Sequence, residues 1–490
     1  MPAISPHHHQ KPALGRFPTW LIDNGVYLAL LTAVVWVAID RWDGRPAKPR
    51  QGGGGPTTPV KLDPENDRTD QLIKALDALP PLTAKELPAA PQGWTRLGNP
   101  WGMIALGDAL RGTWAPKTRP NLQAALHFVL SAEVQSVLAQ LEAVKPGAWR
   151  GRPRNRPNER SRAGLGFAGL LFAVRARYYA EEASDADAAL ADLTSIYKLA
   201  AFSYNANSYA MASAGMGTEN LAQEELRFLV RRHLLSRAQY ERMQATIAGT
   251  VPEYAGLWTL GVGRSIAAMQ DLLDGGFTKT EDAPGFLAIN HWDRLSRSGW
   301  ARKRRSGIWN LASVFFNDRS VVARKIELRA EAYRRLGNLP YASARERIVV
   351  LRRQNPFITD GPICAAPQSR RLGSSGLSYL TQHVAGRNAT LAALALSAFR
   401  GQHGRYPEAL TELDLTNARP VDPYCGELLR YARVRDGGFV LYSVGPNLTD
   451  DGGRPHRVDE KTGTTALDGD YCFHLPRPEP AYEPQLVENQ

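Results

Sequence analysis

Apolar residues at helical spacing are the feature that most limits what this chain can fold into. Between about Pro100 and Gln354 they recur every three or four residues, as in Leu122, Leu126 and Val129. This spacing is typical of helices that bury one face. The pattern returns in the segments Leu165 to Ala183, Ala188 to Phe202, Asn220 to Leu235, Arg237 to Ala248, Leu257 to Leu273 and Val321 to Leu336. Short breaks between such helices predict helical hairpins packed side by side, without a fixed repeat length.

The N-terminal part has a different character. Residues 1–19 contain His7-His8-His9 and several prolines but no apolar periodicity, so they are predicted to be a disordered tail. Val26 to Ile39 is apolar apart from Thr32. A bilayer needs about 20 residues, and with the flanking tryptophans residues 20–42 are predicted to be a single uncleaved membrane anchor. A signal-peptide core and a buried helix are the alternatives.

A linker and a basic charge balance follow the predicted anchor. Residues 43–99 are rich in glycine and proline and are predicted to be a tether. Sixty Lys and Arg against 48 Asp and Glu give a net charge of +12, which favours anionic neighbours. The arginine-rich stretches 150–162 and 302–305 lack the interleaved aromatic residues that stack on bases. We therefore interpret them as solvated loops, with contact to an anionic envelope component or the membrane surface as the alternative, and nucleic acid is not an expected partner.

Serine acyl-enzyme patterns can be found in an order that resembles penicillin-binding proteins and β-lactamases. They are Ser195-Ile-Tyr-Lys198, Ser203-Tyr-Asn205 and Lys461-Thr-Gly463. Ser203 follows Lys198 too closely, because that family takes these groups from well-separated segments. The histidines have no metal-ligand spacing, and no glycine-rich phosphate loop is present. No catalytic residue is therefore assigned, and an enzyme is not the expected class.

The C-terminal part predicts a different kind of unit. Ala389 to Arg400 is rich in alanine and leucine, which suits a helix packed closely on a sheet. Leu428 to Val434 and Phe439 to Val444 have strand-like composition, and Asp436-Gly437 between them is a strong hairpin signal. Tyr471 to Leu475 is expected to add a third strand. The predicted unit, residues 385–476, is a helix against a small antiparallel sheet, and residues 477–490 are predicted to be a disordered tail.

The motifs of this unit resemble a known family. They are Gly404-Arg-Tyr-Pro407, Asp422-Pro-Tyr424, Leu429-Arg-Tyr431 and Tyr442-Ser-Val-Gly-Pro446, followed by Asp450-Asp-Gly-Gly453. Together they resemble the C-terminal part of the type II secretion major pseudopilin. They are still more similar to the end of a broad class of membrane-anchored bacterial envelope proteins, in which the pattern follows a helical region. The resemblance covers about the last hundred residues.

Two departures separate the chain from pseudopilins. A pseudopilin has a processing site with glycine, a hydrophobic residue and glutamate, which Gly15-Arg16-Phe17 does not reproduce. Its membrane helix also continues directly into the C-terminal module, whereas here a helical region intervenes. Assembly of this chain into a pilus is therefore not expected.

The resemblance also implies a calcium loop. Asn447, Asp450, Asp451, Asp468 and Asp470 supply the oxygen ligands that calcium prefers. An Asp/Gly surface loop without metal is the alternative. In the same unit Cys425 and Cys472 are expected either to form a disulfide in an oxidising compartment or to remain two free thiols.

The fold class expected from these patterns is mainly α with a C-terminal α+β module. Residues 100–384 form the helical domain of this scheme, between the linker and the module. The leading hypothesis is a structural or interaction protein, possibly secretion-related, that is anchored by one span in the bacterial inner membrane. Its partners would be the lipid bilayer and envelope proteins, and calcium is the only cofactor implied. The alternative is an envelope serine acyl-enzyme using Ser195 and Lys198.

The orientation of the anchor rests on two opposed signals. Its downstream flank, with Arg41, Arg45, Lys48 and Arg50, is more basic than the upstream flank, and the positive-inside rule would keep the large domain in the cytoplasm. Long domains, however, translocate largely regardless of charge, and a disulfide would require an oxidising compartment. We therefore expect the bulk of the chain to be periplasmic or otherwise extracytoplasmic.

Overall fold

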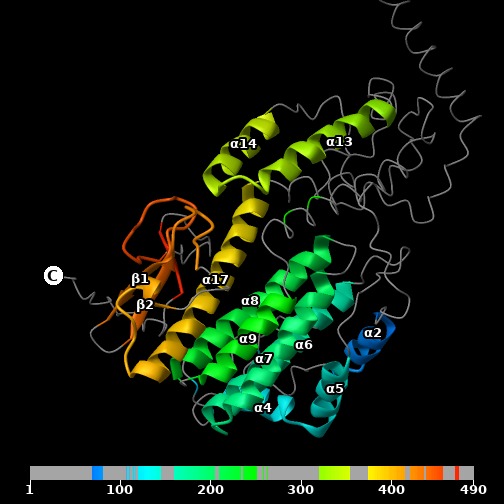
Figure 1. The fold of residues 1–490 in the computed structure, drawn as a ribbon. Helices are drawn as coiled ribbons and strands as arrows, with labels where there is room; N and C mark the ends of the chain where they lie inside the picture. Colours follow the sequence, from blue (N-terminus) through cyan, green and yellow to red (C-terminus); the bar gives the residue numbers. More distant parts are fainter. Residues whose placement is uncertain are drawn as a thin grey trace, which may run out of the picture. The chain divides into compact units, whose positions relative to one another are not determined.

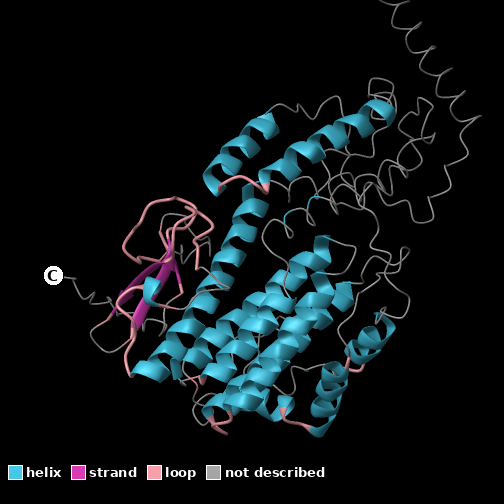
Figure 2. Cartoon of the chain, viewed as in Figure 1, coloured by secondary structure: helices cyan, strands magenta, loops and turns pink. Residues whose placement is uncertain are grey.

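A computed structural model describes residues 69–80, 120–144, 159–204, 209–232, 235–250, 319–353, 374–413, 420–434, 438–455 and 469–473, with residues 106, 110, 114, 116, 258 and 262. Within these ranges the chain is mostly helical and carries one small antiparallel sheet (Figures 1 and 2). The expected combination of a helical fold with a small sheet is confirmed. The predicted tails 1–19 and 477–490, the anchor 20–42 and most of the linker lie outside the described residues.

The chain divides into two compact units. Except for the first residues of one helix, Arg319–Leu336, all elements that follow belong to the larger unit. The described helices are α2 (Thr69–Asp77), α4 (Pro120–Val129), α5 (Ala132–Ala143), α6 (Glu159–Glu181), α7 (Ala186–Tyr204), α8 (Tyr209–Arg232), α9 (Arg237–Thr250), α13 (Arg319–Leu336), α14 (Tyr341–Arg353) and α17 (Ser374–His403).

A helical bundle of α6, α7, α8 and α9 forms the centre of the larger unit (Figure 1). Its helices pack through apolar faces with the spacing that the sequence predicts. On α7, Leu190, Leu193, Ile196 and Ala200 recur every three or four residues and are almost fully buried. Burial of such side chains contributes about 1.5 to 3 kcal/mol for each large one and drives the association of the helices.

Two arginines on α6 reinforce this bundle with buried ion pairs. The Arg177 guanidinium donates from Nε and Nη2 to the two carboxylate oxygens of Glu225 on α8, at 2.8 Å each. Its planar face lies over the Phe228 ring, with 3.7 Å between Cζ and the ring centroid. A bidentate pair of this kind fixes the rotation of α8 relative to α6 as well as its distance.

Arg175 lies two residues earlier on α6. It points to the opposite side of the helix because each residue turns the helix by about 100°. It donates from Nε to both carboxylate oxygens of Asp192 on α7, at 3.1 and 2.9 Å, and from Nη1 to Gln135 Oε1 on α5, at 2.8 Å. Glu142 of α5 forms a further ion pair with it. Burial, and to a lesser extent Glu142, raises the pKa of Asp192 to about 6, although Arg175 opposes this.

The helices α4 and α5 form a bent pair. No single helix among the described residues is long and apolar enough to cross a membrane. The pair Leu122–Val129 and Ala132–Ala143, bent by 63°, passes the same test of length and composition. Its apolar side chains, such as Val134 and Leu138, are buried within the fold. Ser131 begins α5 by accepting a hydrogen bond from the Val134 amide on its side-chain oxygen, at 3.4 Å.

The sheet has the order β1-β2-β3 and is antiparallel throughout. The strands β1 (Arg430–Arg433) and β2 (Phe439–Ser443) pair with Tyr431 opposite Leu441, as the strand pattern predicts. The third strand, β3 (Tyr471–Cys472), begins where the predicted Tyr471 to Leu475 begins, and residues 474 and 475 lie outside the described residues. The Phe473 amide still donates to the Leu441 carbonyl at 2.8 Å, so the pairing extends slightly beyond β3.

The helix α17 packs against both the bundle and the sheet. It has 30 residues and runs without interruption through the predicted boundary between residues 384 and 385. On the sheet side, Asn388 donates through Nδ2 to the Val421 carbonyl at 2.7 Å, and Tyr424 donates its hydroxyl to the Ser378 carbonyl at 3.2 Å. We call the segment from residue 404 to 473 the terminal module.

The α14 helix contacts the same module. The Tyr341 ring of α14 meets the Tyr424 ring edge-on, with centroids 4.6 Å apart, and Tyr424 in turn contacts Tyr471 of β3 at 5.7 Å. Arg345 donates to the Pro446 carbonyl at 2.8 Å. Stacked and edge-on tyrosines of this kind stabilise by about 0.5 to 1.5 kcal/mol beyond their buried area. The module is therefore held to α14 as well as to α17.

The close approach of α7 and α8 predicts a specific stability effect. A Cβ atom on Gly215 would lie 2.8 Å from Ser203 Cβ and 3.1 Å from the Ala200 carbonyl oxygen, so Gly215→Ala should destabilise the protein by about 1 to 3 kcal/mol. Gly217 of the same helix has nothing within 4 Å. Gly217→Ala should instead stabilise by about 0.5 to 1 kcal/mol through its better helix propensity. Urea unfolding of both variants measures the difference, and equal effects would contradict the close approach.

Candidate functional site

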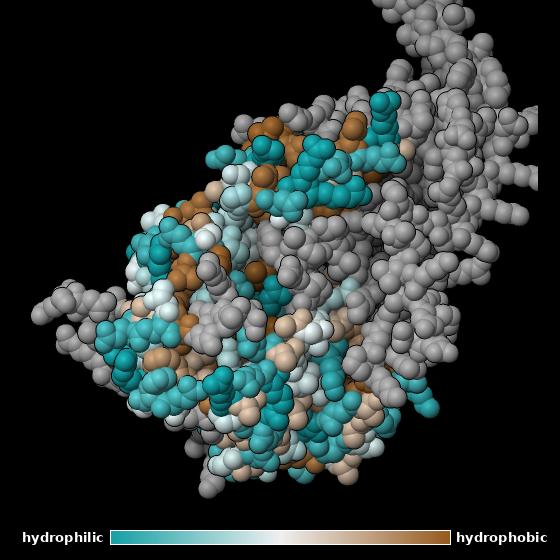
Figure 3. All heavy atoms as spheres, in the orientation of Figure 1, coloured by the Kyte–Doolittle hydropathy of each residue, from teal (hydrophilic) through white to brown (hydrophobic). Residues whose placement is uncertain are grey.

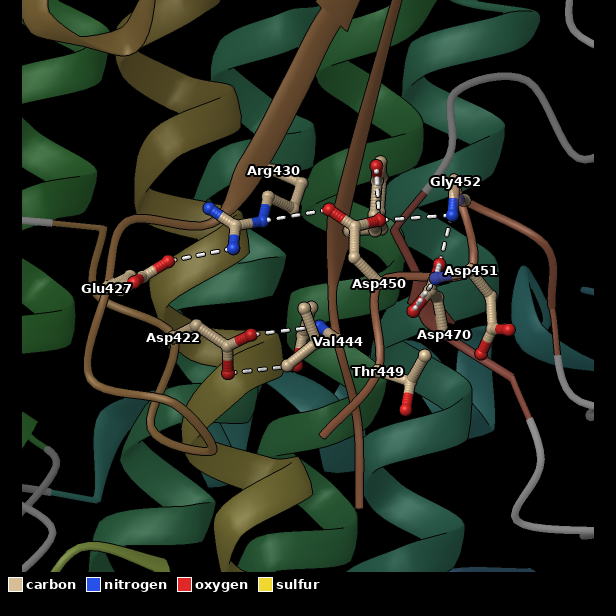
Figure 4. Close-up of polar contacts among 12 residues, drawn as sticks. Asp422, Glu427, Arg430, Val444, Thr449, Asp450, Asp451, Gly452 and Asp470 are labelled. Carbon is tan, nitrogen blue, oxygen red and sulfur yellow. Dashed lines mark hydrogen bonds and ion pairs between the residues drawn. The ribbon is translucent and has the colours of Figure 1, made fainter. Parts of the chain in front are cut away.

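The terminal module is organised around the buried side chain of Asp422. Its Oδ1 accepts hydrogen bonds from the Tyr424 amide and from the Ser443 hydroxyl, both at 2.9 Å. Its Oδ2 accepts from the Val444 amide, also at 2.9 Å (Figure 4). One carboxylate thus joins the Asp422-Pro-Tyr424 turn to the end of β2. Burial raises the pKa of Asp422, while these hydrogen bonds oppose the rise.

A second carboxylate, that of Asp450, belongs to the loop after β2 and connects this loop to β1 and β2. Asp450 Oδ1 accepts from the Tyr442 hydroxyl and from the Gly452 amide, at 3.0 Å each. Its Oδ2 lies 3.1 Å from Nε of Arg430, which also pairs with Glu427 at 2.7 Å (Figure 4). Burial, followed by the hydrogen bond to this carboxylate, raises the pKa of the Tyr442 hydroxyl.

A third carboxylate, that of Asp470, binds the loop of residues 447–453, which we call the acidic loop. Asp470 precedes β3, and its Oδ2 accepts from the Gly453 amide at 2.7 Å and from the Asp451 amide at 3.1 Å. The backbone at Gly452 and Gly453 has positive φ angles of 69° and 81°, which glycine adopts without strain. Asp451 in turn accepts from Asn447 Nδ2 at 2.8 Å. Each of these polar side chains therefore shapes the loop.

The resemblance implies a calcium loop in this segment, and an Asp/Gly loop without metal is the alternative. Calcium needs six to eight oxygen atoms pointing at one centre, whereas the Asp450, Asp451 and Asp470 carboxylates face N–H and O–H donors of the chain. In the ranges that the structure describes, no group of three or more His, Cys, Asp or Glu could hold a metal ion. Asp468 lies outside those ranges. The full ligand set thus stays a prediction.

The structure contains Cys425 and Cys472 as free thiols. The Cys472 thiol points to the Gly453 carbonyl, with 3.0 Å between sulfur and oxygen. Neighbouring side chains on a strand point to opposite faces, and Tyr471, not Cys472, contacts the Tyr424 ring. The tyrosines thereby occupy the contact between the two segments.

The serines of the acyl-enzyme patterns lie inside the bundle. Ser195 and Ser203 both belong to α7 and are buried. Their hydroxyls donate to carbonyls one turn earlier, Ser195 to Ala191 and Ser203 to Leu199, at 3.2 Å each. Lys198 lies one turn after Ser195 on the same helix and is partly exposed. Asn205 and the pattern Lys461 to Gly463 are outside the described residues.

A buried polar cluster that the sequence reasoning did not identify lies between α7, α8 and α17. His383 Nε2 lies 2.8 Å from Glu219 Oε2, and the Tyr204 hydroxyl donates to the same oxygen at 2.6 Å. The other ring nitrogen, Nδ1, lies 2.6 Å from Asn220 Oδ1. Gln223 donates to Glu219 Oε1 at 2.8 Å. The one sequence signal was that Glu219 and Gln223 occupy helical positions alongside buried Ala222 and Leu226.

Charge and burial explain the state of this cluster. Burial alone would raise the pKa of Glu219, but His383, Arg387 and the Tyr204 hydroxyl outweigh it and lower the pKa. Burial and the negative charge of Glu219 raise the pKa of Tyr204 and of Tyr197, so both phenols stay neutral. The cluster is closed to solvent, since the side chains of His383 and Glu219 are both 0% exposed. It therefore holds helices together and offers no open reaction site.

Comparison with known proteins adds no relative. No family model matches the chain, and no curated protein and no solved structure is detectably similar to it.

The role of Asp422 as the centre of the module gives a testable prediction. Asp422→Asn places an N–H donor opposite the Val444 amide or the Ser443 hydroxyl, and so leaves at least one buried donor without an acceptor. The expected loss of stability is about 1 to 3 kcal/mol. The control is Glu427→Gln, which breaks the exposed ion pair with Arg430 in the same module and should cost less than about 1 kcal/mol. Thermal unfolding measures both variants, and equally small losses would show that Asp422 is not central.

Proposed function

We propose that the chain is a structural or interaction protein of the bacterial envelope, anchored in the inner membrane, whose terminal module is related to that of pseudopilins. The observation that carries this proposal is the continuity of α17, which joins the helical bundle to the small sheet in one element. The sheet itself is built from the motifs that resemble pseudopilins, since Asp422, Tyr442 and Asp450 each hold two segments together. Those motifs thus have a structural reason to occur together.

The packing of α17 supports a non-polymerising role for the module. In a pseudopilin the helix entering the module is the membrane helix itself. In this chain the helix that enters the module is α17, and it is covered by α8, α9 and α14 of the same chain (Figure 1). A helix whose faces are already occupied cannot pack against other subunits of a filament without leaving its bundle. The proposed role is therefore a fixed envelope component and not a pilus subunit.

Exposed apolar side chains on α13 and α14 support the interaction part of the proposal. Leu328 of α13 is 66% exposed, and Val349 and Val350 of α14 are also exposed. Figure 3 shows hydrophobic colour among hydrophilic residues over these two helices. Leu328 and Val350 sit among charged neighbours of their own helices, including Arg324 and Arg347. The proposed partner protein would cover these apolar side chains and leave the charged residues at the edge of the contact.

The alternative, a serine acyl-enzyme, has no support from α7. Ser195 is buried and its hydroxyl donates to the Ala191 carbonyl within the helix, so it lacks the exposure that an acyl-enzyme nucleophile requires. We therefore propose an interaction protein without acyl-enzyme chemistry at Ser195 and Lys198.

The first prediction of this proposal concerns membrane attachment and orientation. In bacterial cells the full chain should sediment with inner membranes, and a variant lacking residues 1–50 should not. Alkaline phosphatase fused at the C-terminus should be active, and green fluorescent protein fused there should be dark. A soluble full chain would contradict the anchor. Active green fluorescent protein at the C-terminus would contradict the extracytoplasmic placement alone.

The second prediction concerns the acyl-enzyme alternative. The purified chain should give no covalent adduct with a fluorescent β-lactam, because the Ser195 hydroxyl is inaccessible. The measurement is in-gel fluorescence against a penicillin-binding protein as positive control. A signal that disappears in Ser195→Ala and persists in Ser236→Ala, a serine outside the bundle core, would overturn the proposal in favour of the enzyme.

A further inference from the structure

The acidic loop and Asp470 bring three carboxylates close enough to repel one another. Burial raises the pKa of Asp470, the amides of Gly453 and Asp451 oppose this, and the negative charges of Asp450 and Asp451 add to the rise. Carboxylates gathered in this way need cations or hydrogen-bond donors to stay ionised. The resemblance to pseudopilins implies that a calcium ion supplies the positive charge, so the groups that supply it in this chain decide whether calcium is needed.

Donors of the chain itself face both oxygens of Asp451 and both oxygens of Asp470. Asp451 accepts on Oδ2 from Asn447 Nδ2 at 2.8 Å and on Oδ1 from Arg454 Nη2 at 3.3 Å. Asp470 accepts from the Asp451 amide on Oδ1 and Oδ2, at 3.3 and 3.1 Å, and from the Gly453 amide on Oδ2 at 2.7 Å. Backbone amides thus compensate Asp470, and a side-chain cation compensates Asp451.

Arg430 supplies the cation at the third carboxylate, that of Asp450. Its Nη2 donates to Glu427 at 2.7 Å, and its Nε lies 3.1 Å from Asp450 Oδ2 (Figure 4). Nε is a buried atom without an aligned hydrogen-bond acceptor, so its contact with Asp450 is electrostatic. The other oxygen of Asp450 accepts from the Tyr442 hydroxyl and the Gly452 amide. One guanidinium therefore joins the start of β1 to the acidic loop and carries positive charge for two carboxylates.

We propose that Arg430, assisted by Arg454, is a built-in counter-cation that takes the place of calcium in the terminal module. The acidic loop closes on donors and cations of its own chain, and the module neither binds calcium nor depends on it. A divalent cation at Asp450 would be repelled by the guanidinium on the same carboxylate. These contacts lie within the larger unit and do not depend on the proposed membrane anchor.

A second arginine of the same strand provides a matched control. Arg433 also lies in β1, and its side chain is 37% exposed, as is that of Arg430. Arg433 pairs with Glu408 at 3.4 Å, and Glu408 lies outside the acidic loop. The substitution Arg433→Gln therefore removes the same charge from β1 but leaves the counter-cation of Asp450 in place.

The Cys472 thiol reports directly on the acidic loop. Its sulfur lies 3.0 Å from the Gly453 carbonyl oxygen and is partly buried. Opening of the loop exposes the thiol, so its rate of reaction with a maleimide measures the local opening equilibrium. The measurement uses full-length protein with Cys364→Ser and Cys425→Ser, which leaves Cys472 as the single thiol.

Calcium itself is the first probe. A calcium Kd of about 10⁻⁴ to 10⁻³ M, typical of extracellular modules, would make about 10 mM CaCl2 slow the thiol reaction by about 10- to 100-fold. We expect instead a change of less than about twofold, equal to that given by MgCl2, because only ionic strength acts. Titration of CaCl2 into the protein should give no saturable heat. Calcium-specific slowing, or saturable calcium binding that is lost in Asp450→Asn or Asp468→Asn, would overturn the proposal.

The arginine variants test the counter-cation. Arg430→Gln should speed the thiol reaction by roughly 2- to 10-fold at low salt, the effect of losing two partly exposed ion pairs. Arg430→Lys keeps the charge and should stay closer to the unaltered chain, and Arg433→Gln should change the rate by less than about twofold. Helical circular dichroism checks that each variant folds, and the calcium titration of the unaltered chain does not depend on any variant. Equal rates for Arg430→Gln and Arg433→Gln would overturn the role of Arg430.

Discussion

The packing of α17 is the constraint on which the rest of the larger unit depends. This one helix packs against the bundle on one face and against the sheet on the other. A helix 30 residues long spans about 45 Å, enough to reach α14 near its start and the sheet near its end. Because both partners share it, neither can shift without carrying α17 along or breaking the contacts between α8 and α17. The small sheet, too small to be stable alone, gains a scaffold in this way.

Buried charge is used in two different ways in this fold. On α6, Arg175 and Arg177 form multiple hydrogen bonds to carboxylates on α7 and α8, and their desolvation is offset by bidentate geometry and by the ring of Phe228. These pairs fix helices that are already joined by apolar packing. The His383–Glu219 pair instead joins α17 to α8, and the Tyr204 hydroxyl of α7 donates to the same Glu219 oxygen, so this cluster connects three helices.

Periodicity predicted the local elements well because it reflects burial directly. Ala188 to Phe202 was expected to be helical and α7 spans Ala186–Tyr204, while Phe439 to Val444 corresponds to β2. The cluster of Glu219 and His383 could not be predicted, since these residues are 164 positions apart and meet only through the packing of three helices. The uninterrupted course of α17 was also missed. The sequence predicted a helix only for Ala389 to Arg400 and a boundary between residues 384 and 385, whereas the helix begins at Ser374 and Gly386 allows a close approach to α8.

The acidic loop shows why residue type alone does not define a metal site. Asp422, Asp450 and Asp470 have the side chains that calcium prefers, yet each accepts hydrogen bonds from backbone amides. A loop that returns between strands exposes amides that no strand partner can satisfy, and a short carboxylate is the side chain best placed to accept from them. The same aspartates would therefore recur in a module of this shape with or without metal. The aspartate pattern therefore reflects the geometry of the turns. A metal ion would have to replace the hydrogen bonds that these carboxylates already accept from the chain.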